Sequence, residues 1–166
     1  MFIAYFMLCQ LFSIFVDEHM ENIADISEKP HMVNLPRFLD PRGNLSVIEQ
    51  MKEAPFKINR TYWVYDVPGG DGREGHAYRK NCEMIVALSG SFEVATESGA
   101  EETVYQLNRC YQALYVPAGT WRELRNFSTN SVALVLASEP YCEEDYLLTR
   151  AEYQQFLAEK GERTND

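Results

Sequence analysis

The residues best suited to chemistry in this sequence lie in two short segments, one around His76 and one around Arg122. The first segment carries an imidazole and a phenol two positions apart, His76 and Tyr78, with the Glu83 carboxylate five positions further on. An imidazole titrates near neutral pH and can act as a base, whereas a phenol and a guanidinium can donate hydrogen bonds to a developing oxyanion. The combination predicts proton-transfer chemistry.

The spacing in both segments follows a known pattern. The first segment matches the cupin motif G-x5-H-x-H-x4-E-x6-G, with Tyr78 in place of the second histidine. The second matches P-x-G-x2-H-x3-N, with Arg122 in place of the histidine and Tyr111 where that motif opens on glycine. The chain therefore resembles the cupins. This resemblance implies an all-β fold, a single cupin jelly-roll (RmlC-like) barrel with a short C-terminal helix. The other matching positions are Gly70, Gly90, Pro117, Gly119 and Asn126.

Two of the four positions that hold a metal ion in metal-binding cupins are Tyr78 and Arg122 here. A guanidinium stays protonated and repels a cation, and a neutral phenol is a poor ligand for a divalent metal. His76 and Glu83 alone would bind a metal weakly. We therefore predict no catalytic metal and no other cofactor.

The elements that must position these residues are short strands. Segments rich in β-branched and aromatic residues follow one another, separated by turn residues, and this spacing favours an antiparallel sandwich or barrel. Residues 76–89 are read as a strand that ends in a turn. A helix is predicted only near the C-terminus, where Thr149 and Glu152 form a capping box and Tyr153, Phe156 and Leu157 share one face. The expected strands are 44–49, 57–67, 83–89, 91–96, 103–107, 111–117, 121–127 and 132–138.

The N-terminal segment, residues 1–30, is set apart from the expected jelly-roll domain at 31–160 and the tail at 161–166. Residues 1–16 are almost wholly apolar, but the run is shorter than the roughly 20 residues of a spanning helix and lacks the features of a signal peptide. Residues 17–34 are read as a linker or a loose helix. Three interpretations stay open: a weak membrane anchor, a helix packed on the domain or a partner, and, favoured here, an over-extended start codon. We expect a cytoplasmic protein, with membrane contact only if residues 1–16 are an anchor.

The charge balance limits the ligands. The 166 residues include 15 Lys and Arg against 25 Asp and Glu, for a formal net charge of −10. Nucleic-acid binding is excluded because it depends on neutralising phosphates with cations. An anionic ligand needs cations that are concentrated locally, and Arg73, Arg79 and Lys80 form the most basic short stretch.

From about residue 33 to 157 the chain resembles the WxcM-like sugar-nucleotide 3,4-ketoisomerases, metal-free cupins acting on dTDP-4-oxo-6-deoxyglucose. The resemblance implies an isomerase of dTDP-deoxysugar and polysaccharide biosynthesis. It would move the keto group from C4 to C3 through an enediol, as a homodimer that exchanges N-terminal strands. The family motif R-G-x-H-A-H-[KR] is altered at Glu74 and at Tyr78. The matching segments are 40–45, 48–49, 56–64, 73–80, 88–91, 115–121, 135–138 and 141–146.

On this interpretation His76 is the base that removes the C3 hydrogen, with Tyr78 and Arg122 as its catalytic partners. The oxyanion donor is Arg122, Tyr78 or Arg42. Pairing with an arginine or with the backbone inside the barrel is favoured for Glu83 over a catalytic role. The candidates for stacking on the thymine are Tyr62, Trp63 and Trp121, and packing in the core is the alternative for Tyr62 and Trp121. The expected substrate-binding residues are Arg42, Tyr62, Arg73, Arg79, Lys80, Glu83 and Trp121.

Two other functions stay open at this point. A dTDP-sugar 3,5-epimerase also begins by removing a proton beside a C4 ketone and uses a His–Tyr pair. A non-catalytic sugar-nucleotide-binding cupin would retain the pocket, with Tyr78 marking a lost acid. The R-x-G-H-A segment at 73–77 and the V-L-A-S…D-Y ending, with V-L-A-S at 135–138 and D-Y at 145–146, favour the ketoisomerase.

Overall fold

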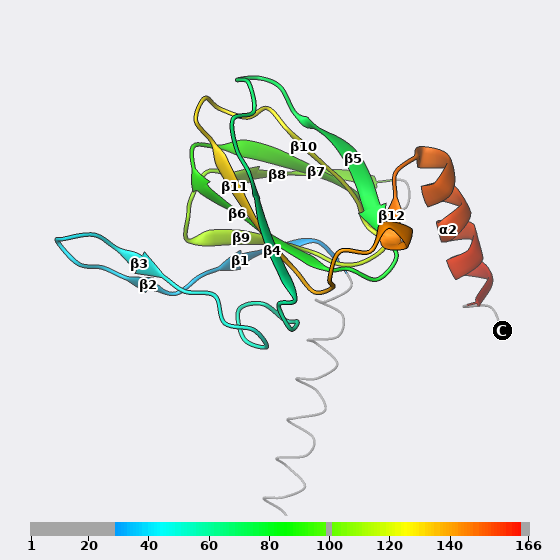
Figure 1. The fold of residues 1–166 in the computed structure, drawn as a ribbon, viewed down its shortest axis with the longest axis horizontal. Helices are drawn as coiled ribbons and strands as arrows, with labels where there is room; N and C mark the ends of the chain where they lie inside the picture. Colours follow the sequence, from blue (N-terminus) through cyan, green and yellow to red (C-terminus); the bar gives the residue numbers. More distant parts are fainter. Residues whose placement is uncertain (1–28, 99–100, 164–166) are drawn as a thin grey trace, which may run out of the picture.

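Two five-stranded antiparallel sheets face each other in the computed structural model, which describes residues 29–98 and 101–163 (Figure 1). The first sheet has the strand order β1-β9-β6-β11-β4 and the second β12-β5-β10-β7-β8. A separate hairpin, β2–β3, projects away from both sheets. The strands are β1 (His31–Asn34), β2 (Arg37–Phe38), β3 (Leu45–Ser46), β4 (Arg60–Val64), β5 (Arg73–Tyr78), β6 (Glu83–Ser89), β7 (Phe92–Ser98), β8 (Glu101–Leu107), β9 (Gln112–Val116), β10 (Trp121–Arg125), β11 (Val132–Ala137) and β12 (Tyr146–Leu147).

The main hydrophobic core lies between the two sheets. Successive side chains of a strand point to opposite faces, so every second residue of β6 and β11 points inward, as Ile85 and Val135 do. Phe92 and Phe127 stack within this core with ring centroids 4.8 Å apart. The open space between the sheets lies between β4 and β5.

Most of the expected strands are present, and two expectations need correction. Residues 31–34, read as part of a linker, form β1 because His31 to Asn34 pair in register with β9. Residues 76–89, read as one strand, contain the end of β5, a turn at 79–82 and all of β6. Asp145 fixes this turn by accepting hydrogen bonds from the backbone N–H groups of Lys80 and Asn81, at 2.7 and 3.1 Å. The turn at 79–82 therefore joins β5 of the second sheet to β6 of the first sheet.

The C-terminal helix α2 (Arg150–Arg163) forms as predicted. Thr149 and Glu152 make the reciprocal capping bonds: the Thr149 N–H donates to Glu152 Oε2 at 2.9 Å, and the Glu152 N–H donates to Thr149 Oγ1 at 3.2 Å. Tyr153 is fully buried against β10, with Phe156 and Leu157 beside it. The helix lies to one side of the barrel, beside β12 of the second sheet (Figure 1).

Among the described residues, no helix is long and apolar enough to cross a membrane. The apolar run at residues 1–16, and with it the three interpretations of the N-terminal segment, lies outside the described residues.

Candidate active site

A cavity of about 720 Å³ opens between β4 on the first sheet and β5 on the second. Residues at alternate positions share one face of a strand, so His76 and Tyr78 of β5 point into the cavity together. The same rule places Tyr62 of β4 and Arg122 of β10 on its walls. The remaining lining residues are Arg60, Val64, Gly72, Arg73, Glu74, Gly75, Leu124, Val135, Tyr141, Tyr146 and Leu148.

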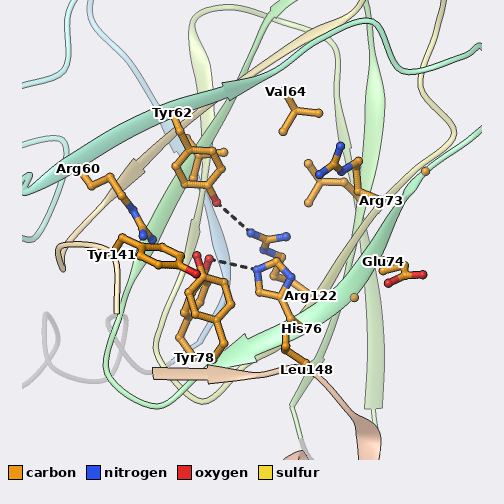
Figure 2. A pocket seen from close by; sticks show the side chains of 15 residues that line it. Arg60, Tyr62, Val64, Arg73, Glu74, His76, Tyr78, Arg122, Tyr141 and Leu148 are labelled. Atoms are coloured by element: carbon orange, nitrogen blue, oxygen red, sulfur yellow. Dashed lines mark hydrogen bonds between the residues drawn. The ribbon is translucent and has the colours of Figure 1, made fainter. Parts of the chain in front are cut away.

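His76 and Tyr78 are hydrogen-bonded to each other inside this cavity. The Nε2 atom of His76 lies 3.1 Å from the Tyr78 hydroxyl, and the two rings meet edge to face (Figure 2). His76 Cα also pairs with Arg122 across the β5–β10 ladder. The sequence prediction of an imidazole, a phenol and a cation in one site is therefore matched by their positions.

Arg122 and Glu83 form an ion pair at the base of the cavity. Arg122 Nε donates to Glu83 Oε2 at 2.9 Å, and the exposed fractions of the two side chains are 6% and 1%. Tyr62 joins both: its hydroxyl donates to Glu83 Oε1 at 2.6 Å and accepts from an Arg122 terminal nitrogen at 3.1 Å. Glu83 is thus a buried partner of Arg122, as favoured from the sequence, and it does not line the cavity.

The protonation states follow from this packing. Burial and then the Arg122 charge lower the pKa of His76 from its ordinary value of 6.5 to about 4, so the imidazole is neutral at pH 7. Burial and the nearby Glu83 carboxylate raise the pKa of Tyr78, so its phenol keeps its proton. Burial alone would raise the pKa of Glu83, but the Arg122 guanidinium holds it below its ordinary value. At neutral pH the site therefore combines a neutral base with a phenol donor and an ion pair.

Three aromatic or cationic residues of the wall were absent from the sequence prediction. The Tyr146 ring lies 4.6 Å from the Tyr78 ring centroid and 5.4 Å from that of His76. Tyr141 lies 5.7 Å from Tyr146 at the rim. Arg60 lies at the start of β4, with its guanidinium 5.5 Å from the Tyr62 ring centroid. Period-two alternation back from Tyr62 could have found Arg60. The family match at 141–146 covered Tyr146, but the two-residue strand β12 gave no alternation that assigned its side chain to the cavity.

Trp121 needs correction as a substrate-binding residue. It neighbours Arg122 on β10, so its side chain points to the opposite face of the sheet. There it is buried with Tyr153 beneath α2, and the Arg150 guanidinium lies 4.3 Å from its ring centroid. A Cβ at Gly75 would come within 2.5 Å of the indole nitrogen, so glycine at this position leaves the room that the indole takes. The core-packing alternative for Trp121 is the correct one.

Three of the expected phosphate-binding or oxyanion-binding cations lie outside the cavity. Arg79 and Lys80 follow β5 in the exposed turn, and the Arg79 guanidinium lies 5.7 Å from the Phe156 ring centroid of α2. They leave the cavity because the chain turns away at the end of β5. Arg42 lies in the β2–β3 hairpin, where it pairs with Asp40 at 2.9 Å and its side chain is 90% exposed. Arg73 is the expected phosphate-binding residue that does line the cavity.

The residues of the cavity do not form a recognisable metal site. Within residues 29–98 and 101–163 no three His, Cys, Asp or Glu side chains lie close enough together to hold a metal ion. Glu83 is committed to Arg122 and Tyr62, which leaves His76 and the Glu74 carboxylate as the lining groups able to ligate a metal, fewer than the three or more protein ligands of a zinc site. The residues present do not fit a metal ion, and no step below depends on one.

The two-sheet barrel and this site together define a cupin whose metal-ligand positions carry a hydrogen-bonded acid–base pair. Residues 28–160 match the protein family described as "FdtA: WxcM-like, C-terminal". The chain belongs to this WxcM-like family.

Two relatives within the family show how much of the chain is shared. The TDP-4-oxo-6-deoxy-alpha-D-glucose-3,4-oxoisomerase of Aneurinibacillus thermoaerophilus is 34% identical over 127 residues, which cover 76% of this chain and 91% of the relative. The sugar 3,4-ketoisomerase QdtA of Thermoanaerobacterium thermosaccharolyticum, solved in complex with TDP, is 30% identical with a TM-score of 0.76. That match covers 80% of this chain and 96% of QdtA. A point mutant of QdtA has been solved in complex with TDP-4-keto-6-deoxyglucose.

A more distant structure shares the fold alone. The rmlC epimerase of Mycobacterium tuberculosis is 15% identical, with a TM-score of 0.62 over 74% of this chain and 69% of the epimerase. This likeness confirms the RmlC-like jelly roll that the sequence motifs implied.

Proposed function

We propose that this protein is a cofactor-independent 3,4-ketoisomerase that converts dTDP-4-oxo-6-deoxyglucose into the corresponding 3-keto sugar. The observation that carries the proposal is the His76–Tyr78 hydrogen bond inside a cavity whose base is the Arg122–Glu83 ion pair. The family membership and the named substrate complex of QdtA support the choice of substrate.

The first step is removal of the C3 hydrogen by the neutral imidazole of His76. The C4 ketone acidifies this hydrogen, the C3–H electron pair becomes the C3–C4 double bond, and the carbonyl π electrons move to the C4 oxygen. The lowered pKa of His76 matters here because it keeps the imidazole unprotonated at neutral pH, and only an unprotonated imidazole can accept the proton. Substrate entering between His76 and Tyr78 replaces their mutual hydrogen bond, which frees both groups.

In the second step the C3 hydroxyl proton moves to the C4 oxygen and the proton held by His76 returns to C4, so that the C3 oxygen becomes the new ketone and C4 carries a hydroxyl. Substrate and product are isomers, so no oxidant or reductant is consumed. The Tyr78 hydroxyl is suited to hydrogen-bond the C4 oxygen as charge builds there, and the remaining N–H groups of Arg122 face the same space. Because burial keeps Tyr78 protonated, it acts as a donor rather than as a base.

Binding of the nucleotide requires a cation at the mouth of the cavity. Arg73 is the exposed arginine at the start of β5 and lines the cavity beside Glu74. We assign the diphosphate to Arg73 because a guanidinium matches the geometry of phosphate oxygens.

We also propose that the protein is a homodimer in which the β2–β3 hairpin packs on the partner. Phe38, Leu39 and Leu45 on this hairpin have exposed fractions of 57%, 70% and 59%. An apolar groove of about 300 Å³ lies on the outer face of the first sheet, with Ile58 and Leu134 among its lining residues. Clustered apolar exposure of this kind marks an interaction surface. Exchange of the hairpin is the route by which Arg42 would reach a substrate cavity.

Two measurements separate these proposals. Light scattering at micromolar concentration is expected to give a dimer, and the double variant Phe38→Asp with Leu45→Asp is expected to give a monomer. A monomeric wild-type protein would overturn the proposed dimer and leave the proposed activity standing.

Proton NMR of the dTDP-4-oxo-6-deoxyglucose reaction in D2O tests the activity. Deuterium at C4 with the ketone at C3 supports the isomerase. Deuterium at C3 and C5 with the ketone kept at C4 supports an epimerase, and no exchange indicates binding only.

A further inference from the structure

Arg60 lies in the wall of the cavity on the side opposite Arg122. It is the first residue of β4, on the same strand face as Tyr62, and it lines the same space as His76. Figure 2 shows the two guanidiniums with the Tyr62 and Tyr78 phenols between them. Each guanidinium lies near one of these rings: Arg60 is 5.5 Å from the Tyr62 centroid, and Arg122 is 6.0 Å from the Tyr78 centroid.

The charge of Arg60 is not neutralised by a carboxylate. No Asp or Glu in the described part of the chain forms an ion pair with it. Its side chain hydrogen-bonds the neutral Tyr146 phenol, but its Nε atom is buried and has no hydrogen-bond partner among the described residues. Unpaired buried donors are rare in folded proteins because each one costs about 1–3 kcal/mol. A donor left in this state at the wall of a cavity indicates a missing anionic or polar ligand.

Arg122 differs from Arg60 in this respect. Its charge is balanced by Glu83 at 2.9 Å, and one terminal nitrogen donates to Tyr62. An oxyanion near this neutral pair gains dipolar stabilisation, whereas an oxyanion near Arg60 gains an uncompensated charge–charge interaction in a partly desolvated site. The positive potential available to a developing negative charge therefore comes mainly from Arg60.

We propose that Arg60 is a further catalytic residue, which binds the enediolate oxygen that forms when His76 removes the C3 proton. This inference rests on the proposed isomerase function. When the C3–H bond breaks, its proton goes to the imidazole and the negative charge goes to the C4 oxygen. Arg60 offers that oxygen a fixed cation without moving, and the interaction weakens when the C3 hydroxyl proton reaches the C4 oxygen and the His76 proton returns to C4.

The substrate carries a second anion, the diphosphate, which could also bind an arginine that has no carboxylate partner. Arg60 is half-buried among phenols that contact His76, whereas Arg73 is exposed at the other end of the cavity. The two arginines are therefore assigned to different anions, Arg60 to the enediolate and Arg73 to the diphosphate. TDP contains the diphosphate but no sugar, so its affinity distinguishes the two assignments.

The test compares Arg60→Gln and Arg60→Lys with the wild-type protein. We expect Arg60→Gln to lower kcat by about 10²- to 10³-fold, the usual effect of removing one oxyanion donor. Arg60→Lys keeps the charge and is expected to recover kcat to within about tenfold of the wild type. The Kd for TDP, measured by calorimetry, is expected to change less than about threefold in both variants, less than ~1 kcal/mol. Arg73→Gln serves as the contrast and should weaken TDP binding at least about fivefold.

Each outcome has one meaning. If the wild-type protein converts the substrate and Arg60→Gln keeps its kcat, the role of Arg60 is wrong and the isomerase function stands. If Arg60→Gln loses TDP binding as Arg73→Gln does, Arg60 binds the diphosphate and the proposal is overturned. If the wild-type protein shows no exchange in D2O, the proposed function itself fails. Thermal unfolding of each variant, beside Arg109→Gln as an exposed arginine outside the cavity, shows whether the fold is intact.

Discussion

Replacing Glu83 with glutamine tests the buried ion pair on which the site is built. Glu83→Gln keeps the size and one carbonyl acceptor but removes the charge that balances Arg122. The two side chains are 1% and 6% exposed, so the cation left behind is almost fully buried. Breaking a buried pair by removing one partner costs about 3–5 kcal/mol. We expect about 3 kcal/mol here, because the cavity lets water reach one side of Arg122.

The measurement is urea unfolding at pH 7.5, with Glu102→Gln as the matched control. Glu102 also pairs with an arginine, Arg125 at 3.0 Å, but the two side chains are 51% and 32% exposed. An exposed pair contributes about 0–1 kcal/mol, so the control should unfold near the wild-type midpoint. A loss of 3 kcal/mol in Glu83→Gln corresponds to a fall in Tm of roughly 6–12 °C for a domain of this size.

The stability that Glu83 contributes should depend on pH in a defined direction. The Glu83 pKa is held below its ordinary value of 4.5, so its contribution to stability is fully present above that value. It is lost as the pH falls from 4.5 through the lower pKa of the folded state. The free energies of unfolding of the wild type and Glu83→Gln should therefore differ by the same amount at pH 7.5 and at pH 5.5. This difference should become smaller only below about pH 4.5. A difference under about 1 kcal/mol at pH 7.5 would refute the reasoning.

Three further predictions concern the acid–base groups and the metal. Because the His76 pKa is lowered to about 4, kcat/KM should stay flat from pH 7.5 to about 5 and fall only as the pH approaches 4; a half-maximum near 6.5 contradicts this. Tyr78→Phe should lower kcat at least about tenfold, ~1.4 kcal/mol of transition-state stabilisation; if it is silent in steady-state assays, the phenol only lines the wall. Protein treated with EDTA should keep full activity, whereas one tightly bound metal per chain by elemental analysis, with activity lost on chelation, would show that Tyr78 and Arg122 do not exclude a metal site.

The sequence was sufficient to predict the parts of this protein that repeat at fixed spacing. The cupin motif spacings identified His76, Tyr78, Glu83 and Arg122, because each lies at a defined position of a strand pair. Gly90 illustrates the reason: it lies in the β6–β7 turn with φ +64, where a Cβ would come within 2.5 Å of Ser131 Oγ. Such a position constrains the residue type, so it is visible in one sequence.

Positions set by tertiary packing could not be read in the same way. Trp121 and Arg122 are neighbours in sequence, yet strand alternation and the helix α2 put them on opposite faces of the second sheet. Arg79 and Lys80 looked suitable for a phosphate because of their charge alone, but the turn after β5 carries them out of the cavity. Tyr146 lies in the family-matching segment 141–146, but it reaches the site through a two-residue strand too short to show which way its side chain points. The type of a residue predicted its role where a motif had already fixed its position on a strand. Where no motif did so, the residue type gave wrong assignments.

The most direct test of the central claim is deuterium exchange by His76→Asn. Asparagine keeps a polar side chain of similar size but cannot accept a proton near neutral pH, so this change removes the proposed base and leaves the Arg122–Glu83 pair in place. With dTDP-4-oxo-6-deoxyglucose in D2O, we expect the variant to bind the substrate while its rate of deuterium incorporation falls about 10²- to 10⁴-fold, the usual contribution of a general base. Incorporation at C4 at close to the wild-type rate would show that another group removes the C3 proton.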